Sequence, residues 1–266
     1  MTLTLTILGC GSSGGVPRVG NDWGACDPVN PKNRRRRCSI LASSKATAGT
    51  TNVLIDTSPD LREQMLSAQV EHLDAVWFTH DHADHTHGLD DIRAFFLMNK
   101  KRVPIHADAH TMRTLESRFG YCFLSSNEYP AIAELNEITP YQTITAFGAG
   151  GCISAMPIPV LHGSIEALCF RSGGAAYMPD VNGLPDAAKA ALQGLDLLII
   201  DALRIRRHPS HYSLAETLDV IAELKPKRSV ITNMHVDLDY ETLRRDLPKN
   251  VVPAFDGLIL HVSDAA

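Results

Sequence analysis

Apolar residues along this chain fall into short runs that predict strands, separated by segments in which apolar residues recur at helical spacing. Strict alternation of apolar and polar residues at 1–7 predicts a strand with one buried face. Mostly apolar runs at 73–78 and 195–200 predict buried strands. We expect further strands at 38–41, 52–55, 103–106, 152–160, 167–171, 175–178, 229–234 and 258–262, and helices near 61–66, 89–97, 111–119, 214–224 and 239–247.

A dense cluster of histidines and aspartates directly follows the predicted strand at 73–78. Residues 79–88, THDHADHTHG, contain four imidazoles and two carboxylates. On extended backbone, residues two apart point the same way, so His80 and His82 can reach one ion as neutral donors. Asp84 and His85, where the next helix begins, can face a neighbouring position. A solvated loop explains a lone histidine well, but this density favours a metal site.

Residues suited to metal binding also end several later predicted strands. His162 follows the strand at 152–160, Asp180 follows the strand at 175–178, and His235 follows the strand at 229–234. Taken alone, each of these three residues could be an ordinary turn residue.

The pattern His-x-His-x-Asp-His after a strand, followed by a histidine, an aspartate and a histidine at strand ends, resembles the signature of the metallo-β-lactamase superfamily. The resemblance covers nearly the whole chain. It implies an α/β fold, an αββα sandwich in which two mixed sheets pack face to face with helices on the outer faces. It also implies a single domain, 1–266, built from two pseudo-symmetric halves of about 1–150 and 151–266.

The same resemblance implies a site for two divalent metal ions, Zn²⁺ or Mn²⁺, because nitrogen and carboxylate ligands suit both. Open coordination would let the ions share a hydroxide that attacks the substrate. Asp56, which ends the strand at 52–55, would orient the ligands. One ion would be held by His80, His82 and His162 and the other by Asp84, His85 and His235, with Asp180 bridging the two.

Composition narrows the classes of function. The chain has 266 residues, of which 44% are hydrophobic, enough for a large core. A net charge of −5 argues against a general nucleic-acid binder. No apolar run approaches the roughly 20 residues of a membrane span, and no basic leader precedes the first strand. Six cysteines without a Cys-x-x-Cys pair fit a reducing compartment, so we expect a cytoplasmic protein.

The segment between the first two strands carries two candidate anion-binding features. The sequence GCGSSGG at 9–15 can bring backbone amides and hydroxyls close to an anion, and Ser13 is our candidate substrate-binding residue there. An ordinary glycine-rich turn is the alternative. The loop at 16–37 ends in four consecutive arginines, for which a solvated surface is the default interpretation and an anion path or subunit contact the alternative.

A capping box begins the helix at 214–224. Ser213 and Glu216 have the S-x-x-E spacing of such a box. His211 lies just before this helix, whose positive end lowers imidazole basicity unless an anion is bound. The tRNase Z and phosphodiesterase branches of the superfamily use a histidine here as proton donor, so the resemblance implies His211 and Asp84 as catalytic residues.

Within the superfamily, the opening GCGSSGGVP, the arginine-rich loop and the His211 segment are most similar to the phosphoribosyl 1,2-cyclic phosphate phosphodiesterase group. Many members bind a structural zinc through cysteines after Gly-Val-Pro. Here Cys26 and Cys38 lie nearby and Leu238 stands three residues after His235, a departure that leaves such a site open.

The resemblance therefore implies a metal-dependent phosphodiesterase acting on a small cyclic phosphate or nucleotide-like ester. His211 would protonate the departing alkoxide. Arg204, Arg206 or Arg207 would bind a second phosphate or ribose, although a surface position is the simpler interpretation for each. Because this group tends to form dimers, we expect a homodimer, with no membrane or stable nucleic-acid partner.

Several alternatives stay open to different degrees. A secreted β-lactamase is disfavoured by the missing signal peptide and by an aspartate rather than a cysteine at position 180. A tRNA 3′-processing endonuclease shares the ligands but needs a basic arm that we do not find. A glyoxalase-type thioesterase leaves His211 without a role. A non-catalytic, metal-dependent carrier of a nucleotide-like anion remains the alternative from another class.

Overall fold

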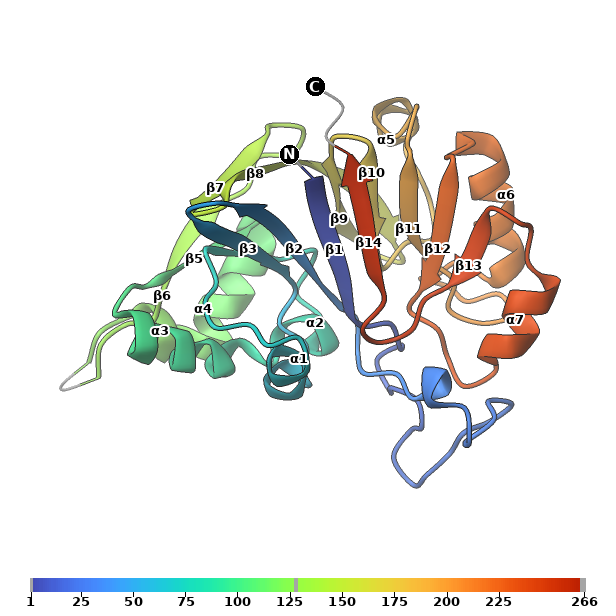
Figure 1. The fold of residues 1–266 in the computed structure, drawn as a ribbon, viewed down its shortest axis with the longest axis horizontal. Helices are drawn as coiled ribbons and strands as arrows, with labels where there is room; N and C mark the ends of the chain where they lie inside the picture. Colours follow the sequence, from blue (N-terminus) through green and yellow to red (C-terminus); the bar gives the residue numbers. More distant parts are fainter. Residues whose placement is uncertain (1, 127–128, 264–266) are drawn as a thin grey trace.

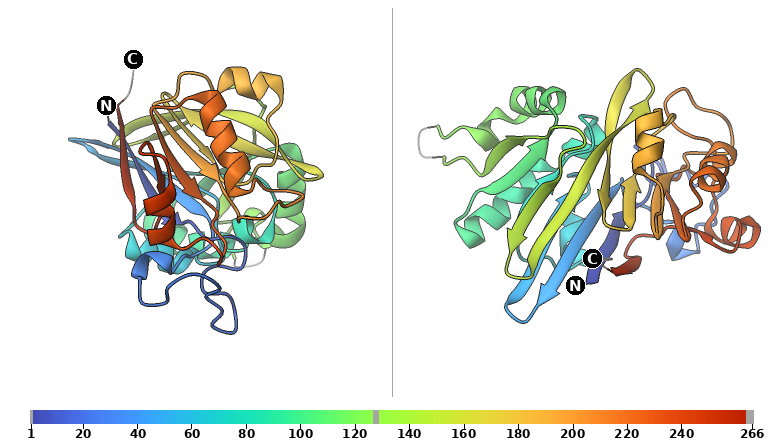
Figure 2. Two further views of the ribbon diagram at one scale, coloured as in Figure 1. Left: turned by 90° about the vertical axis from the view of Figure 1, so that its right-hand side faces the viewer. Right: turned by 90° about the horizontal axis from the view of Figure 1, so that it is seen from above.

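Two seven-stranded β-sheets pack face to face in the computed structural model, which describes residues 2–126 and 129–263 (Figure 1). Both sheets mix parallel and antiparallel pairs. Helices lie on the outer faces of the pair (Figure 2). The α/β sandwich expected from the sequence is therefore confirmed. None of the helices in the described residues is both long enough and apolar enough to cross a membrane.

The first sheet is built from the N-terminal part of the chain and the last strand. In spatial order its strands are β14 (Ile259–Ser263), β1 (Thr2–Gly9), β2 (Ser39–Ala46), β3 (Gly49–Ile55), β4 (Ala75–Trp77), β5 (Val103–Ala107) and β6 (Ala133–Glu137). The helical segments of this part are η1 (Pro31–Asn33), α1 (Leu61–Ser67), α2 (Ala83–Thr86), η2 (Leu89–Ile92), α3 (Arg93–Asn99) and α4 (Ala109–Phe123).

The second sheet is continuous in sequence apart from its inserted helices. Its strands in spatial order are β13 (Val251–Pro253), β12 (Arg228–Thr232), β11 (Leu197–Asp201), β10 (Ala175–Met178), β9 (Ile165–Ser172), β8 (Gly151–His162) and β7 (Ile144–Gly148), with α5 (Asp186–Ala191), α6 (Leu214–Leu224) and α7 (Tyr240–Asp246) beside them. Because β7 belongs here and β14 pairs with β1, the sheets do not divide the chain at residue 150.

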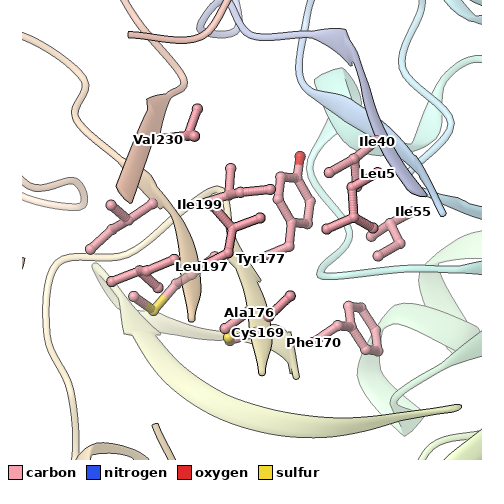
Figure 3. Close-up of a cluster of buried hydrophobic side chains, with 14 of the residues drawn as sticks. Leu5, Ile40, Ile55, Cys169, Phe170, Ala176, Tyr177, Leu197, Ile199 and Val230 are labelled. Carbon is pink, nitrogen blue, oxygen red and sulfur yellow. The ribbon is translucent and has the colours of Figure 1, made fainter. Parts of the chain in front are cut away.

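Side chains on the two faces of the first sheet belong to two separate hydrophobic cores. On β4, Ala75 and Trp77 point into the core between the sheets, whereas Val76 points into the core under the helices of the first half. Figure 3 shows the core between the sheets, where Ile40 and Ile55 of the first sheet face Phe170 and Tyr177 of the second. Both faces of these strands are buried, which explains their mostly apolar sequences.

Several elements differ from the sequence expectation. The helix expected near 89–97 is broken into η2 and α3. The strands β6, β7 and β13 and the helix α5 were not predicted. They are short, and three of them lie at or near sheet edges, where the alternation of apolar and polar residues is weak. The capping box of α6 is confirmed, because Ser213 and Glu216 bond reciprocally.

Of the four consecutive arginines expected on a solvated surface, Arg34 is exposed, whereas Arg35 is buried and Arg36 and Arg37 are half-buried. Arg35 is 2% exposed and donates to the carbonyl oxygen of Leu238 at 2.7 Å. Buried carbonyl oxygens and paired carboxylates compensate the arginine charges, which is the condition for burying them. Arg36 and Arg37 form ion pairs with Asp256 (3.0 Å) and Asp60 (2.8 Å).

Neither cysteine of the long loop lies in a group of metal-type side chains within the described residues. The Cys26 sulfur lies 3.8 Å from Nη1 of Arg35, and the Cys38 sulfur lies 3.6 Å from the hydroxyl of Thr232. Both thiols are buried.

Candidate metal centre

The metal-type residues meet because several strands end at the same side of the sandwich. In the second sheet β10, β11 and β12 run parallel, and β8 runs the same way because β9 is antiparallel to both β8 and β10. The carboxyl ends of parallel strands are the usual place for a ligand site. His162, Asp180, Asp201 and His235 follow or end these strands, and the turn after β4 brings in His80.

Four of the expected ligands form one compact cluster. His80, His82, His162 and Asp180 each offer a ligand atom, and these atoms all lie within 4.8 Å of one another. The rings of His80 and His82 have centroids 4.6 Å apart, as expected for residues two apart on extended backbone. Three imidazoles and a carboxylate suit a divalent transition metal.

Contacts to Nδ1 of His80 and of His162 leave Nε2 of each ring facing the cluster, where Nε2 of His162 lies 3.2 Å from Nδ1 of His82. Nδ1 of His80 lies 2.9 Å from the Thr79 hydroxyl, and Nδ1 of His162 donates to the carbonyl oxygen of Ser210 at 2.6 Å. Nε2 of His80 is buried and makes no hydrogen bond within the described residues. A buried nitrogen without a partner is costly, so these residues fit a metal ion.

For His80, His162 and Asp180, burial and charge favour the protonation state that a metal ligand needs. Burial lowers the pKa of His80 and of His162, which favours neutral rings with a free lone pair. Burial opposes ionisation of Asp180, but the charge and hydrogen bond of His85 outweigh it and hold the pKa of Asp180 well below its usual value.

The ligands expected for a second ion are brought together less completely. Nε2 of His85 lies 3.1 Å from Oδ1 of Asp180 and 3.6 Å from Oδ2 of Asp84. His235 faces the same cavity, but its Nε2 lies 3.1 Å from Nη1 of Arg18. Asp84 and His85 therefore adjoin the compact cluster at Asp180, whereas His235 contacts a guanidinium.

Asp56 lies where the sequence expectation places it, directly behind one of these ligands. The side chain is fully buried and accepts from Nδ1 of His85 at 2.7 Å. It also accepts from the backbone N–H and the hydroxyl of Thr79, both at 2.8 Å. Its φ of 65° is a left-handed conformation that aspartate tolerates. Asp56 thus fixes both the ring of His85 and the turn that carries His80.

His211 lies beside the cluster with its ring held from behind. Nδ1 of His211 donates to Oδ2 of the buried Asp201 at 2.8 Å, and Nε2 lies 3.8 Å from Oδ2 of Asp180. Burial lowers the pKa of His211, but the hydrogen bond and the charge of Asp201 outweigh it and raise this pKa to about 8. The expectation that the helix end lowers its basicity was wrong, because the nearby carboxylates dominate.

Five of the expected ligands and catalytic residues border one cavity of about 410 Å³, a volume typical of small-molecule sites: His82, Asp84, Asp180, His211 and His235. Of the candidate substrate-binding residues, Ser13 and Arg204 line it, while Arg206 and Arg207 do not. Arg207 pairs with Glu216 at 2.7 Å, and Arg204 donates to the carbonyl oxygens of Arg206 and Arg207. The lining residues are Ser12, Ser13, Gly14, Arg18, His82, Asp84, Asp180, Leu203, Arg204, His208, His211, Asn233 and His235.

Four residues of the site were not singled out from the sequence: Arg18, Asp201, His208 and Asn233. Asp201 ends a predicted strand and Asp180 follows another, so the position at a strand end was the signal that could have identified Asp201. Asn233 donates to the carbonyl oxygen of Pro179 at 3.0 Å and so joins two strand ends. Asn233, Arg18 and His208 carry no distinctive local pattern.

Comparison with known proteins agrees with this geometry. Residues 51–234 match the family model described as a β-lactamase superfamily domain. The crystal structure of a diphosphatase from the PhnP family is 38% identical, with a TM-score of 0.88 and 98% of each chain covered. The metallo-β-lactamase fold protein YhfI from Bacillus subtilis is 16% identical, with a TM-score of 0.70 over 98% of this chain and 99% of that one, which shows the fold alone.

A curated relative matches along most of the chain. An octanoyltransferase from Porphyromonas gingivalis (strain ATCC BAA-308 / W83) is 31% identical over 260 residues, 95% of this chain. The chain spans 50% of the length of that relative. Fold, histidine–aspartate cluster and matches agree on one superfamily. The chain belongs to the metallo-β-lactamase superfamily and, within it, to the PhnP family.

Proposed function

We propose that this protein is a phosphodiesterase that uses two divalent metal ions, Zn²⁺ or Mn²⁺, to hydrolyse a small cyclic phosphate or nucleotide-like ester. The observation that carries the proposal is the position of His211. Its Nε2 faces the Asp180 side of the metal cluster while its Nδ1 is held by Asp201. A metal cluster needs no such histidine to bind ions, but ester hydrolysis needs a proton donor for the leaving oxygen.

The residues that would hold the ions follow from the cluster. His80, His82, His162 and Asp180 would hold the first ion. Asp84, His85 and Asp180 would hold the second, joined by His235 once its contact with Arg18 is released. Such ions activate water near neutral pH and neutralise charge on phosphoryl oxygens.

His211 would deliver the proton to the leaving group. The contact with Asp201 fixes its ring so that Nε2 faces the cavity. A raised pKa keeps this nitrogen protonated near neutral pH, as a general acid requires. Asp84, which lines the same cavity, would act with it as ligand and catalytic group. The related PhnP-family structure is of a diphosphatase, which also cleaves a bond between phosphorus and oxygen.

Substrate binding and assembly belong to the same proposal. Ser13 and Arg204 line the cavity and would contact the substrate, whereas we no longer assign that role to Arg206 or Arg207. We also propose a cytoplasmic homodimer without a membrane or stable nucleic-acid partner. Light scattering on the purified protein tests the dimer.

Hydrolysis of bis(p-nitrophenyl) phosphate by metal-loaded protein tests the proposal, with His82→Ala as the control that removes a ligand. We expect turnover far above the control, together with about two ions per chain by elemental analysis. Turnover no higher than in His82→Ala would reject the enzyme in favour of a carrier. A parallel screen with cyclic phosphates, nucleotides and short RNA separates the small-ester function from the tRNA-processing alternative, which predicts cleavage of RNA.

A further inference from the structure

His235 is an expected metal ligand whose ring contacts a charged side chain at each of its two nitrogens. Its Nδ1 lies 2.7 Å from Oδ1 of Asp237, and its Nε2 lies 3.1 Å from Nη1 of Arg18. The backbone is held as well, because the N–H of His235 donates to the carbonyl oxygen of Leu203 at 2.9 Å. The ring is thus fixed between a carboxylate and a guanidinium.

The two contacts agree on which ring nitrogen carries the proton. An ionised carboxylate only accepts hydrogen bonds, so Nδ1 of His235 donates to Asp237. A guanidinium only donates, so Nε2 of His235 accepts from Arg18 through its lone pair. A metal ion needs the same lone pair from a neutral histidine, and a carboxylate behind the ring raises the basicity of the ligand. Asp237 therefore orients Nε2 of His235 for an ion.

Asp237 is itself held by the neighbouring strand end. Its Oδ2 accepts from the backbone N–H of Ile205 at 3.3 Å, and Ile205 lies in the segment that follows β11. The carboxylate therefore joins the segments after β11 and β12. It contacts His235 as Asp56 contacts His85, at 2.7 Å from Nδ1 in both cases.

Arg18 reaches the cavity from the long connection between β1 and β2, which lies at the lower edge of Figure 1. Its Nε donates to Oδ2 of Asp22 at 2.9 Å, and the backbones of Arg18 and Asp22 are bonded to each other. The N–H of Gly24 donates to Oδ1 of Asp22 at 3.0 Å. Because Asp22 holds the guanidinium, Arg18 keeps a partner when its contact with His235 is broken.

Arg18 and a metal ion would use the same atom of His235. One lone pair cannot both accept from Arg18 and coordinate an ion. The positive charge of the guanidinium, 3.1 Å from Nε2, also repels a cation at that place. The compact cluster for the first ion does not include His235, so its ligands are assembled independently of this contact.

We propose that Asp237 is a positioning residue for the second metal ion and that Arg18 competes with this ion for His235. The proposal rests on the two-ion function above and deepens it. The two side chains change the affinity for the second ion in opposite directions, and the first ion binds before the second. Arg18 stays joined to Asp22 when the ion displaces it from His235.

Zinc titration of metal-free protein against a chromophoric chelator tests the proposal without any substrate. We expect wild type to bind two ions per chain with different affinities. Asp237→Asn keeps the size of the side chain but removes the charge behind His235, so the affinity for the second ion should fall about 10–100-fold.

Arg18→Met should have the opposite effect, because it keeps the length of the side chain but removes the competing donor. The affinity for the second ion should rise by at least about tenfold, as loss of one charge-assisted hydrogen bond allows. The affinity for the first ion should stay within about threefold of wild type in Arg18→Met and in Asp237→Asn, because neither residue belongs to the compact cluster.

The same two substitutions in the background of His235→Ala show whether the residues act through His235. We expect both effects to disappear there, because the ring that the two residues share is gone. Arg245→Met and Asp246→Asn are matched controls, since these residues are also an arginine–aspartate pair but lie on α7 outside the cavity lining. Neither control should change either affinity.

Several outcomes overturn the proposal. They are a single ion bound by wild type, a second-ion affinity that does not fall in Asp237→Asn or does not rise in Arg18→Met, and effects that persist in His235→Ala. A misfolded protein cannot imitate the expected result, because Arg18→Met should bind more tightly than wild type. The expected shifts in a protein without phosphodiesterase activity would support this inference and reject the proposed function. Their absence in an active phosphodiesterase would do the reverse.

Discussion

At the scale of single residues, the site works by fixing one side of each ring so that the other side faces the cavity. His85 is held by the carboxylate of Asp56, His162 by the carbonyl oxygen of Ser210, and His211 by the carboxylate of Asp201. Each contact determines which ring nitrogen carries the proton. The role of each histidine is therefore decided by the group behind it.

Asp56→Asn should weaken metal binding without removing a ligand. Asparagine tolerates the left-handed backbone at this position, but it loses the charge that orients His85. We expect the affinity for Zn²⁺ to fall about 10–100-fold, measured by competition with a chromophoric chelator. The exposed Asp91→Asn serves as control and should bind like wild type. Affinities of Asp56→Asn within twofold of wild type would contradict the role.

We expect His211→Ala to lower the rate of hydrolysis much more for esters with poor leaving groups than for esters with good ones. Loss of a general acid costs about 10²–10⁴-fold when the leaving group is an alkoxide. It should cost much less with p-nitrophenolate, which needs little protonation. We expect Asp201→Asn to show the same split more weakly, with metal content unchanged. His110→Ala, which removes a histidine that is 64% exposed, should show no split. Equal losses on both substrate types would remove His211 from the acid role.

At the scale of elements, the long connection between β1 and β2 is held against α7 by one carboxylate. Asp239 caps α7 by accepting from the N–H of Thr242 at 2.9 Å. Its other oxygen accepts from the side-chain amide of Asn33 at 2.7 Å and from the N–H of Asp27 at 3.2 Å. The loop that carries Arg18 therefore depends on a helix more than 200 residues later in the sequence.

Asp239→Ala should destabilise the protein in a pH-dependent way. Partial burial raises the pKa of Asp239, but the bonds from Thr242 and Asn33 outweigh it and lower this pKa to about 2. The folded-state pKa lies below the ordinary value of 3.8, so the carboxylate stabilises the fold above about pH 4 and loses this effect as the pH falls towards 2.

We expect a loss of about 1–2 kcal/mol in unfolding free energy near neutral pH, the usual value of a helix cap. Denaturant titrations at several pH values should show the difference from wild type narrowing below pH 4. Asp219→Ala, at an exposed position on α6, is the control. A difference that stays constant down to pH 2 would contradict the assignment.

At the scale of the whole molecule, the core between the two sheets holds together the edges of the sheets that carry the metal-type residues. Trp77 of β4 and Phe170 of β9 meet across this core with ring centroids 5.6 Å apart, and Figure 3 shows Phe170 in the same cluster. At the cavity end, the N–H of Leu168 donates to the carbonyl oxygen of Thr79 at 2.8 Å, which joins the sheets beside the metal cluster.

Phe170→Ala should therefore cost both stability and metal binding. Removing a buried phenylalanine side chain typically costs about 3–5 kcal/mol, and the loss should appear as a lower denaturant midpoint. We expect weaker metal binding too, because the sheets carry different ligands of one cluster. Phe147→Ala on β7 is the control, since Phe147 is 74% exposed and should change stability by less than about 1 kcal/mol. Equal effects of the two substitutions would contradict this account.

The sequence alone determined the main strands and the first half of the metal-binding residues. The strands that flank the site were predicted because their apolar runs reflect burial on both faces, a property of each strand by itself. The cluster at His80, His82, Asp84 and His85 was predicted because its ligands are neighbours in the chain. His162 and Asp180 were reached through the family pattern, and the structure brings both into the cluster.

Only the tertiary structure decided which polar groups are paired, because those contacts join residues far apart in sequence. The buried Arg35 donates a hydrogen bond to a carbonyl oxygen 203 residues away in the sequence. Arg18 contacts a histidine 217 residues away. The edge strands β6, β7 and β13 likewise depend on their neighbours, since their own sequences alternate weakly. The local sequence specifies the periodicity of apolar residues and the kinds of side chain that can bind a metal. The burial, the hydrogen-bond partners and the pKa of those side chains depend on neighbours that only folding brings close.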